Sequence, residues 1–349
     1  MKDFYGKKVL VTGHTGFKGA WLSKILSVYG AQVVGISDKV EDYHLCYKNL
    51  SKNIFCNEIF QKVENVDFSS IIKKEKIEVV FYLAAQAFVP RAFAFPHNTI
   101  ISNVVGASNF LENLIHLESN LVVVFVTSDK VYENNEWVYG YRENDKLGGV
   151  DPYSASKTAT EIIIRSYREC FLKKKSNISL GIARAGNVIG GGDFSPGRII
   201  PDAIRALENN DSLAVKNPKA TRPWQHVIEP LHGYIKLAQR LKLNKLDGEA
   251  FNFGPTLTDN IPVFELLKIL QDNLPNLNFH SDILGSKIIE HKLLYLDSSK
   301  AQQILNWKTM MNIETSVSWV ADWYRKYLEE PSLLEETMEN QIEKYWGLE

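Results

Sequence analysis

Short apolar runs recur along the first half of the chain, and each is followed by a segment with helical spacing. Lys8–Thr12 is a β-branched apolar run that leads directly into glycine, and the apolar residues between Phe17 and Tyr29 fall on one face of a helix. Gln32–Ile36 is a second apolar run after Gly30, a residue suited to the left-handed position that ends a helix. The amino-terminal segment is therefore predicted to form one strand–helix–strand unit.

The same alternation continues through the middle of the chain. Val79–Leu83 and Leu121–Val126 are almost continuously apolar, as strands buried on both faces of a parallel sheet are, and they flank a helical stretch at Asn103–His116. Ser156–Leu172 is a further helical stretch, and Ile178–Ala183 follows it as another strand candidate. This order predicts an α/β fold with a doubly wound parallel Rossmann sheet, whose ligands bind at the carboxyl ends of its strands.

The regular alternation is lost after about Ala185, where glycines and prolines interrupt short elements. We expect residues 1–186 to form the Rossmann domain, with a return segment around 225–253 because Glu249–Phe253 is again strand-like. Residues 187–349 are expected to form mainly a smaller, mixed α/β carboxyl-terminal lobe that binds the substrate. The charge-rich tail from Glu329 onward predicts a surface helix.

Composition and charge exclude several classes of protein. The 349 residues are 45% hydrophobic and 23% charged, which is enough to bury a large core. Lys and Arg total 40 against 41 Asp and Glu, and this balance argues against a polymeric nucleic acid partner or a polybasic membrane face. The longest apolar run, Val79–Ala85, is far shorter than the ~20 residues that span a bilayer.

The cysteines indicate the compartment. Cys46, Cys56 and Cys170 are odd in number and have no CxxC spacing, so neither a disulfide framework nor a zinc site is supported. We expect a reducing, cytoplasmic location and no metal.

The first chemically informative motif is a glycine turn between the first strand and the first helix. Backbone N–H groups at the start of such a helix face the turn, and glycines let a pyrophosphate approach closely, so the turn predicts a dinucleotide site. The alternative is a tight structural turn. The residues assigned to the cofactor from this motif are Gly13, Thr15, Gly16, Phe17, Lys18 and Gly19.

An acidic residue follows the second strand. Asp38 lies near the offset expected for a carboxylate that binds the adenosine ribose 2′-hydroxyl. Because a carboxylate there would repel a 2′-phosphate, NAD is favoured over NADP, although Lys39 beside it weakens the argument. The alternative is a solvated loop Asp.

A Tyr and a Lys four residues apart open the helix after Pro152. Their spacing puts Tyr153 and Lys157 on one helical face, where the ammonium can lower the pKa of the phenol and so make it a base toward a sugar hydroxyl. The alternative is an ordinary surface pair. The setting, with a glycine turn upstream and a buried strand just before, favours the catalytic interpretation.

A hydroxyl, a carboxylate and an amine follow the strand Leu121–Val126. Ser128, Asp129 and Lys130 would lie at the carboxyl end of a central strand, which is the active-site edge of such a sheet. A simple alcohol dehydrogenase needs the hydroxyl but not the acid and the amine. These extra groups suit the elimination of water, and the alternative is an Asp-Lys turn at a strand end.

These residues resemble the extended short-chain dehydrogenase/reductases, and among them the CDP-glucose 4,6-dehydratases. The resemblance covers nearly the whole chain and includes long strings in the second lobe. Lys130 stands where other nucleotide-sugar dehydratases usually carry Glu, which is typical of the CDP-glucose branch. The matching strings are TGHTGFKGAWL at Thr12, LAAQ at Leu83, TSDKVYEN at Thr127, YGYRENDKLGG at Tyr139, DPYSASK at Asp151, RAGNVIGGGDF at Arg184 and NPKATRPWQHVIEPL at Asn217.

The resemblance implies a three-step reaction on one bound NAD. Tyr153 with Lys157 deprotonates the C4 hydroxyl of the sugar while Ser128 hydrogen-bonds its oxygen, and hydride passes to NAD. Asp129 then protonates the departing C6 hydroxyl and Lys130 takes or relays the C5 proton. Hydride finally returns to C6, so the product from CDP-glucose is a CDP-4-keto-6-deoxyhexose and NAD is not consumed.

The resemblance also implies further contacts. The implied cofactor contacts, with Asn65 and Val66 near the adenine, are Asn65, Val66, Leu83, Ala84, Ala85, Gln86, Tyr153 and Lys157. For the sugar nucleotide they are Asn187, Arg198 and Arg222, since guanidinium groups pair well with phosphate oxygens; each arginine taken alone is as readily a polar surface residue. Trp224 and His226 either pack against the base or fill the core of the lobe.

The expected assembly is a homodimer or a dimer of dimers. The helices Asn103–His116 and Ser156–Leu172 would pair across a twofold axis into a four-helix bundle. Other functions stay open at this point: a 4,6-dehydratase for GDP-mannose or dTDP-glucose, a nucleotide-sugar 4-epimerase, or a catalytically silent NAD-binding scaffold.

Overall fold

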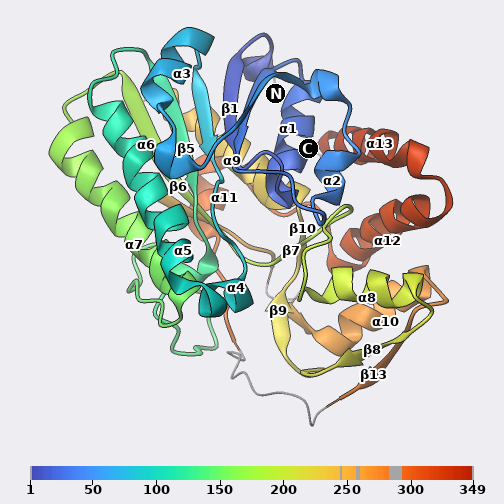
Figure 1. Cartoon of the computed structure of the whole chain (residues 1–349). Helices are drawn as coiled ribbons and strands as arrows, with labels where there is room; N and C mark the ends of the chain where they lie inside the picture. The colour runs from blue at the N-terminus through green and yellow to red at the C-terminus, as the bar shows by residue number, and fades with distance from the viewer. Residues whose placement is uncertain (1, 244–245, 257–259, 283–292, 348–349) are drawn as a thin grey trace.

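A parallel sheet forms the centre of the molecule (Figure 1). The computed structural model describes the chain except for residues 1, 244–245, 257–259, 283–292 and 348–349. Within the described part the sheet has seven strands in the order β11-β6-β5-β4-β1-β2-β3, and every pair is parallel. The predicted doubly wound Rossmann sheet is confirmed. Its strands are β1 (Lys8–Thr12), β2 (Gln32–Ser37), β3 (Phe55–Phe60), β4 (Val79–Tyr82), β5 (Leu121–Val126), β6 (Ile178–Ala185) and β11 (Ala250–Phe253).

Both faces of the sheet are buried, which explains why its central strands read as continuous apolar runs. In β5, Val122 and Val124 join one apolar cluster, whereas Val123 and Phe125 point to the opposite face and join another. Helices α3 (Phe68–Glu75), α6 (Gly106–Ile115) and α7 (Pro152–Tyr167) cover the second face. Helices α1 (Phe17–Val28) and α9 (Ile228–Leu241) cover the first.

The helices α6 and α7 contact each other along one side of the molecule (Figure 1). Helix α6 is preceded by α4 (Val89–Ala94), α5 (Pro96–Ile100) and a π-helical turn, η4 (Ile101–Val105). Helix α7 is continued by a second π-helical turn, η6 (Arg168–Leu172). The predicted helices Asn103–His116 and Ser156–Leu172 thus each contain a π turn.

A second lobe faces the carboxyl ends of the strands. It contains two small sheets, one of β8 and β13 in parallel and one of β9 and β12 antiparallel, while β7 pairs with β10 between the lobe and the central sheet. Its elements are β7 (Val188–Ile189), α8 (Ile199–Glu208), β8 (Ser212–Val215), β9 (Thr221–Pro223), β10 (Gln225–His226), β12 (Asn260–Pro262), α10 (Val263–Asn273) and β13 (Asn278–Ser281).

The chain returns to the central sheet twice after the lobe begins. Helix α9 packs on β5 and β6, and β11 extends the sheet beside β6. The later helices α11 (Ser299–Leu305), α12 (Ile313–Glu329) and α13 (Leu334–Trp346) follow. The remaining short elements are η1 (Lys2–Phe4), α2 (Leu45–Lys48), η2 (Lys52–Ile54), η3 (Val63–Asn65), η5 (Asp129–Val131) and η9 (Pro331–Leu333).

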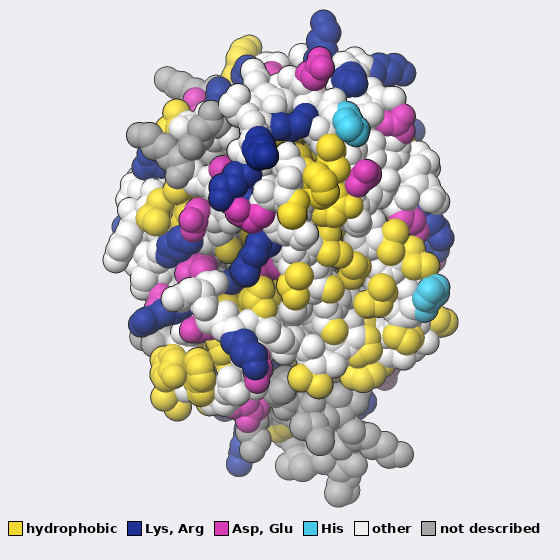
Figure 2. Space-filling view, turned by 90° about the vertical axis from the view of Figure 1, so that its left-hand side faces the viewer, with side chains coloured by type: hydrophobic (Ala, Val, Ile, Leu, Met, Phe, Trp, Pro, Cys, Tyr) yellow, Lys and Arg dark blue, Asp and Glu magenta, His cyan; other side chains and the backbone are white. Residues whose placement is uncertain are grey.

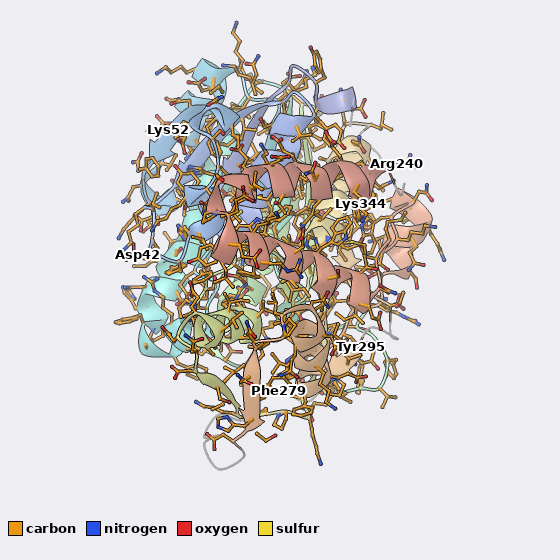
Figure 3. All side chains as sticks on the ribbon, turned by 90° about the vertical axis from the view of Figure 1, so that its right-hand side faces the viewer. Asp42, Lys52, Arg240, Phe279, Tyr295 and Lys344 are labelled. Atoms are coloured by element: carbon orange, nitrogen blue, oxygen red, sulfur yellow. The ribbon has the colours of Figure 1, made fainter. Side chains whose placement is uncertain are left out.

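The charge of the carboxyl-terminal tail predicted a surface helix, but the helix that forms there also buries one of its faces. Helix α13 contacts α1 and α12, and it buries one apolar face that includes Met338 and Ile342. Lys24 on α1 pairs with Glu335 at 2.6 Å across this contact. Figure 3 shows Lys344 on α13, whose Nζ lies 5.4 Å from the ring centre of a Trp on α12. No helix in the described ranges is long and apolar enough to cross a membrane.

Candidate active site

A cavity of about 1430 Å³ lies at the carboxyl ends of the strands, walled by the sheet on one side and by the second lobe on the other. It exceeds the ~300–1,000 Å³ of ordinary small-molecule pockets and can take two ligands. The predicted site residues that line it are Gly13, Thr15, Gly16, Phe17, Lys18, Gly19, Asp38, Leu83, Ala84, Ala85, Gln86, Ser128, Asp129, Lys130, Tyr153, Lys157, Asn187, Arg198 and Arg222.

The glycine turn is packed so tightly that side chains do not fit. Gly13 has φ +72°, in the left-handed region, and a Cβ at Gly19 would lie 2.1 Å from the backbone oxygen of Gly13. Helix α1 begins directly after Gly16, which offers no side-chain cap, so the helix N–H groups at this end can bind an anion. The backbone thus forms a cradle of the kind that binds a diphosphate.

The loop after β2 is held against this turn. Thr15 N donates to Ser37 Oγ at 3.2 Å, and Thr15 Oγ1 donates to the oxygen of Lys39 at 3.3 Å. Lys39 pairs with Glu41 at 2.9 Å, and this hydrogen bond raises the pKa of Lys39. The charge of Lys39 is therefore engaged by Glu41, and Asp38 lies exposed at the cavity wall.

Asn65 and Val66 are not in the wall of the cavity. Asn65 ends the short turn η3 with its side chain exposed, and Val66 is buried in the core under α6. Lys62, Val63 and Glu64 line the cavity instead. The acidic group on this side is Glu64, one residue before the predicted Asn65.

The segment after β4 is fixed by buried hydrogen bonds. Thr12 Oγ1 accepts from both Leu83 N and Ala84 N at 3.1 Å. Asn103, a residue with no predicted role, accepts from Gln86 N at 2.7 Å and donates to Ser156 Oγ at 2.8 Å. Asn103 therefore joins the predicted cofactor segment to α7, and no local motif marks it.

The acid–amine segment begins at the end of β5. Ser128 Oγ donates to Asp129 Oδ1 at 2.9 Å and accepts from Lys130 N at 3.2 Å. Ser128 and Asp129 are buried, at 6% and 4% exposed, whereas Lys130 is partly exposed in the cavity. The predicted hydroxyl, carboxylate and amine thus face the same cavity.

The Tyr-Lys pair enters the cavity from the first turns of α7. Asp151 caps this helix because its Oδ1 accepts from Tyr153 N at 2.9 Å and Ser154 N at 3.0 Å, and Pro152 occupies the first helical position. Tyr153 and Lys157 are 7% and 6% exposed, and Lys157 Nζ donates to the oxygen of Val126 at 3.4 Å.

The protonation of this pair differs from the prediction. Burial raises the pKa of Tyr153 to about 12, against the opposing effects of a hydrogen bond with Ser128 and the charge of Arg198. Burial also lowers the pKa of Lys157 to about 8, with Glu161 opposing. The predicted depression of the phenol pKa by Lys157 does not appear, because the amine is directed to the backbone of β5 and desolvation dominates.

A second amine approaches the cavity from the glycine turn. Lys18 Nζ lies 3.4 Å from the hydroxyl of Tyr234 on α9. Burial lowers the pKa of Lys18 to about 7, and the positive charge of Arg198 adds to the effect while Asp129 opposes it.

The second lobe contributes positive and aromatic groups. Arg198 pairs with Asp193 at 3.0 Å, and its guanidinium lies 5.6 Å from the ring centre of Phe88. Arg222 Nη1 donates to the oxygen of Thr221 at 2.7 Å. Asn187 also lines the cavity, so all three predicted substrate residues belong to its wall.

Of the two aromatic residues with open roles, one faces the cavity and one does not. Trp224 lines the cavity and is 7% exposed. His226 is fully buried between two tryptophans. Its ring centre lies 5.6 Å from that of Trp21 and 5.8 Å from that of Trp319, and burial lowers its pKa to about 3. His226 is therefore a core residue.

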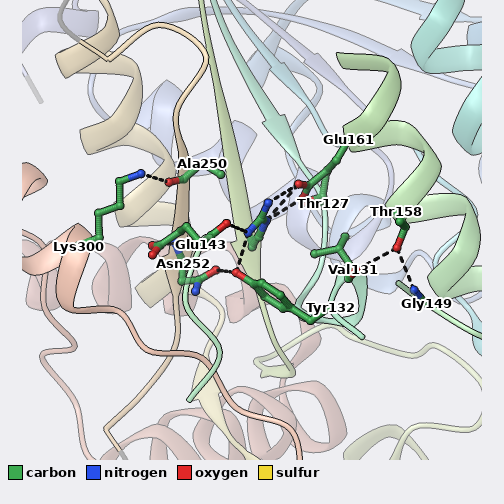
Figure 4. Close-up of polar contacts among 11 residues, drawn as sticks. Thr127, Val131, Tyr132, Glu143, Gly149, Thr158, Glu161, Ala250, Asn252 and Lys300 are labelled. Carbon is green, nitrogen blue, oxygen red and sulfur yellow. Dashed lines mark hydrogen bonds and ion pairs between the residues drawn. The ribbon is translucent and has the colours of Figure 1, made fainter. Parts of the chain in front are cut away.

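A buried polar cluster that no sequence motif predicted adjoins the cavity (Figure 4), and one of its members, Thr127, also lines the cavity. It contains Arg184 of β6, Glu161 of α7 and Asn252 of β11, with hydroxyl groups from Thr127 and Tyr132. These residues are far apart in the sequence, so only the fold brings them together. Among the residues that the structure describes, no group of His, Cys, Asp and Glu is placed to bind a metal ion.

Comparison with known proteins gives a consistent family. The model of the family described as GDP-mannose 4,6 dehydratase matches residues 10–319. A CDP-glucose 4,6-dehydratase of Salmonella typhimurium is 36% identical over 344 residues, which cover 95% of this chain and 95% of the relative. A dTDP-D-glucose 4,6-dehydratase of Bos taurus is 24% identical over 348 residues, which cover 93% and 90%.

Solved structures share the fold. A UDP-glucose 4-epimerase of Thermotoga maritima, solved with UDP-glucose, superposes with a TM-score of 0.77 at 21% identity and covers 92% of this chain and 100% of its own. A dTDP-glucose 4,6-dehydratase of Bacillus anthracis, solved with NAD, has a TM-score of 0.75 at 18% identity and covers 93% and 98%. At these identities the likeness establishes the architecture.

Proposed function

The chain belongs to the GDP-mannose 4,6 dehydratase family, and from this premise we propose that it is an NAD-dependent CDP-glucose 4,6-dehydratase. It converts CDP-glucose to CDP-4-keto-6-deoxyglucose. The observation that carries the proposal is that one cavity gathers the glycine turn, the acid–amine segment, the Tyr-Lys pair and two arginines. We propose CDP-glucose as the substrate because the match to the CDP-glucose 4,6-dehydratase of Salmonella typhimurium covers 95% of this chain and 95% of that relative.

NAD fits the sheet side of the cavity. The Gly13–Gly19 turn offers a cradle that a Cβ would fill, and the segment Leu83–Gln86 faces it across the end of β1. Asp38 lines the cavity and would bind the adenosine ribose, and Glu64 lines the same cavity. When bound, NAD supplies a hydride acceptor for C4 and returns the hydride at C6.

Tyr153 and Ser128 act on the C4 hydroxyl. Tyr153, which shares a hydrogen bond with Ser128, takes the hydroxyl proton, and Ser128 donates to the same oxygen once its hydroxyl turns away from Asp129. Because burial holds the phenol protonated, the phenolate forms only when further positive charge enters the cavity. Lys157, whose pKa burial lowers to about 8, adds positive charge to this side when protonated.

Asp129 and Lys130 carry the elimination. Once C4 is a ketone, C5–H is acidic, and Lys130 takes or relays that proton while Asp129 protonates the departing C6 hydroxyl. Both side chains line the cavity, and the Ser128–Asp129 hydrogen bond links the oxidation and elimination groups at 2.9 Å. On the lobe side, Arg198 and Arg222 face the diphosphate, and Asn187 the sugar.

The test is a panel of sugar nucleotides incubated with purified protein and NAD. We expect the alkali-induced absorbance of a 4-keto sugar with CDP-glucose and none with GDP-mannose, dTDP-glucose or UDP-glucose. A signal only with another nucleotide would refute the substrate and keep the reaction. Epimerised sugar without the keto signal would establish a 4-epimerase, and no turnover with any substrate would indicate a silent scaffold.

We also propose a dimer formed through α6 and α7. Apolar side chains lie across this side of the molecule (Figure 2), and Ile162 of α7 and Val105 before α6 are 57% and 46% exposed. An exposed apolar face of this kind is typical of an interface. Ile162→Asp should therefore give a monomer by light scattering, whereas Leu328→Asp on α12, where the side chain is 41% exposed, should leave the dimer intact.

A reducing, cytoplasmic location is proposed on the cysteines. Cys46, Cys56 and Cys170 are free and lie on α2, β3 and η6. Cell fractionation tests this, and recovery of the protein in an oxidising compartment would refute it.

A further inference from the structure

A buried ion pair stands directly behind the catalytic segment 127–132 (Figure 4). Arg184 Nε lies 2.9 and 3.1 Å from the two carboxylate oxygens of Glu161, and the two residues are 1% and 3% exposed. Neither residue lines the cavity. The pair therefore does not touch substrate or cofactor, and any effect on the reaction must pass through other residues.

The pair contacts both ends of the catalytic segment. Thr127 Oγ1 donates to Glu161 Oε1 at 2.6 Å, just before Ser128. Arg184 Nη1 donates to the hydroxyl of Tyr132 at 2.7 Å, and its guanidinium lies 4.9 Å from the centre of that ring. The four residues between these contacts are Ser128, Asp129, Lys130 and Val131. Their position relative to the core is thus set from both sides.

The same carboxylate belongs to the helix that carries the other half of the site. Glu161 lies one turn after Lys157 and two turns after Tyr153 on α7, so the three side chains share a helical face. The negative charge of Glu161 opposes the burial that lowers the pKa of Lys157. One residue thus joins the acid–amine segment to the Tyr-Lys pair by a hydrogen bond and by charge.

The cluster extends to the edge strand β11 and to the segments around Tyr141 and Asp297. Tyr132 OH donates to Asn252 Oδ1 at 2.7 Å, and Asn252 Nδ2 donates to the backbone oxygens of Tyr141 and Asp297 at 2.8 and 3.2 Å.

Stability alone does not account for the burial of the Arg184–Glu161 ion pair. Desolvation largely cancels the attraction, and apolar replacement of a buried ion pair is often neutral or stabilising.

We propose that Glu161 and Arg184 are positioning residues of the dehydration. They hold Ser128, Asp129 and Lys130 against α7 so that these groups and Tyr153 address the same sugar, and Glu161 supplies the anion that keeps Lys157 protonated. The inference rests on the proposed function, because it assigns the two halves of the site to one reaction.

The hydrogen bond is tested by Thr127→Val, with Thr127→Ser as the matched variant that retains the hydroxyl. Loss of a buried hydrogen bond to a carboxylate should lower kcat ~10-fold in Thr127→Val, with KM within ~2-fold and near-wild-type kcat in Thr127→Ser. Glu249→Gln, which removes the exposed partner of Lys300 at the edge of the cluster, should match the wild type. Equal kcat in Thr127→Val and Thr127→Ser would overturn the positioning role.

The charge is tested without any sugar nucleotide. Competitive acetylation of the free protein across a pH series, with the Lys157 peptide quantified by mass spectrometry, gives the pH at which the amine becomes reactive. In Glu161→Gln that pH should fall, and in Glu161→Asp it should stay near the wild-type value. If Glu161→Gln does not fold, Thr127→Val should leave the titration of Lys157 unchanged while kcat falls, a split that general damage to the fold would not produce.

The two proposals fail separately. An unchanged Lys157 titration in folded Glu161→Gln overturns the charge role even if CDP-glucose is dehydrated. Absence of turnover of CDP-glucose by the wild type, with the titration shifted as expected, refutes the proposed function and keeps the charge relation.

Discussion

Replacing Lys157 by Met should stabilise the protein while abolishing the Tyr-Lys chemistry. The two side chains have similar length, so the packing on α7 is kept, and the buried charge is removed. A lysine pKa lowered from 10.5 to about 8 means that holding the ammonium in the folded state costs ~3 kcal/mol at neutral pH. Loss of the hydrogen bond from Nζ to Val126 O offsets about 1 kcal/mol.

The pH dependence gives this prediction its sign. The folded pKa lies below the unfolded one, so the cost is fully present below about pH 8 and disappears as the pH rises from there to 10.5. The free energy of unfolding of Lys157→Met should therefore exceed that of the wild type by ~2 kcal/mol at low pH. This difference should shrink to about zero near the unfolded lysine pKa of ~10.4.

Urea unfolding of both proteins at three pH values between 6.5 and 10, without added ligands, gives the difference in their free energies of unfolding. It is calculated from the two midpoints and a common m-value. Lys157→Gln, which also lacks the charge but retains a polar end, is the matched control and should gain less. If Lys157→Met were less stable than the wild type at low pH, or if its gain did not change with pH, the buried-ammonium argument would be refuted.

Three further predictions concern catalysis and the cofactor. With CDP-glucose, Tyr153→Phe should slow nicotinamide reduction ~100-fold or more, whereas Asp129→Asn should still reduce the nicotinamide and then stall before elimination; identical single-turnover traces would contradict this division. Calorimetry should show tighter binding of NAD than of NADP, with a smaller difference in Asp38→Ser, and a wild-type preference for NADP would overturn the role of Asp38. Gly19→Ala should lose most NAD affinity because its Cβ would lie 2.1 Å from a backbone oxygen of the turn, whereas Gly347→Ala, where the nearest atom is 3.4 Å away, should bind as the wild type does.

Strands were predicted best where both of their faces are buried. Lys8–Thr12 and Leu121–Val126 agree with β1 and β5 to the residue, because a continuous β-branched run bounded by glycine or polar residues has few other interpretations. Helix ends were less accurate. The apolar spacing alone started this helix at Ser156, whereas the Tyr-Lys motif placed its opening directly after Pro152; the helix begins at Pro152, where Asp151 supplies the cap, and its last turn is π-helical.

Candidate site residues that lie close together in the sequence could be proposed from spacing, and residues that depend on tertiary packing could not. Ser128–Lys130 and the Tyr-Lys pair each fit a single turn of chain, so spacing alone places them on one face. The Arg184–Glu161 pair joins two elements whose side chains carry no local signal. Sequence position alone could not tell that the short turn η3 brings Glu64, and not its neighbour Asn65, into the wall of the cavity.

The return of the chain to β11 sets the order in which the molecule can be built. β6 ends at Ala185, but the strand that covers its open edge begins only at Ala250, after α8, the small strands and α9. As the polypeptide leaves the ribosome, β6 therefore presents unpaired backbone groups until the lobe has been synthesised, and an uncovered edge of this kind invites pairing with other nascent chains. β11 is the last strand of the sheet to be synthesised, so this pairing comes last, after the first part of the lobe has been made and before β12 and β13 follow.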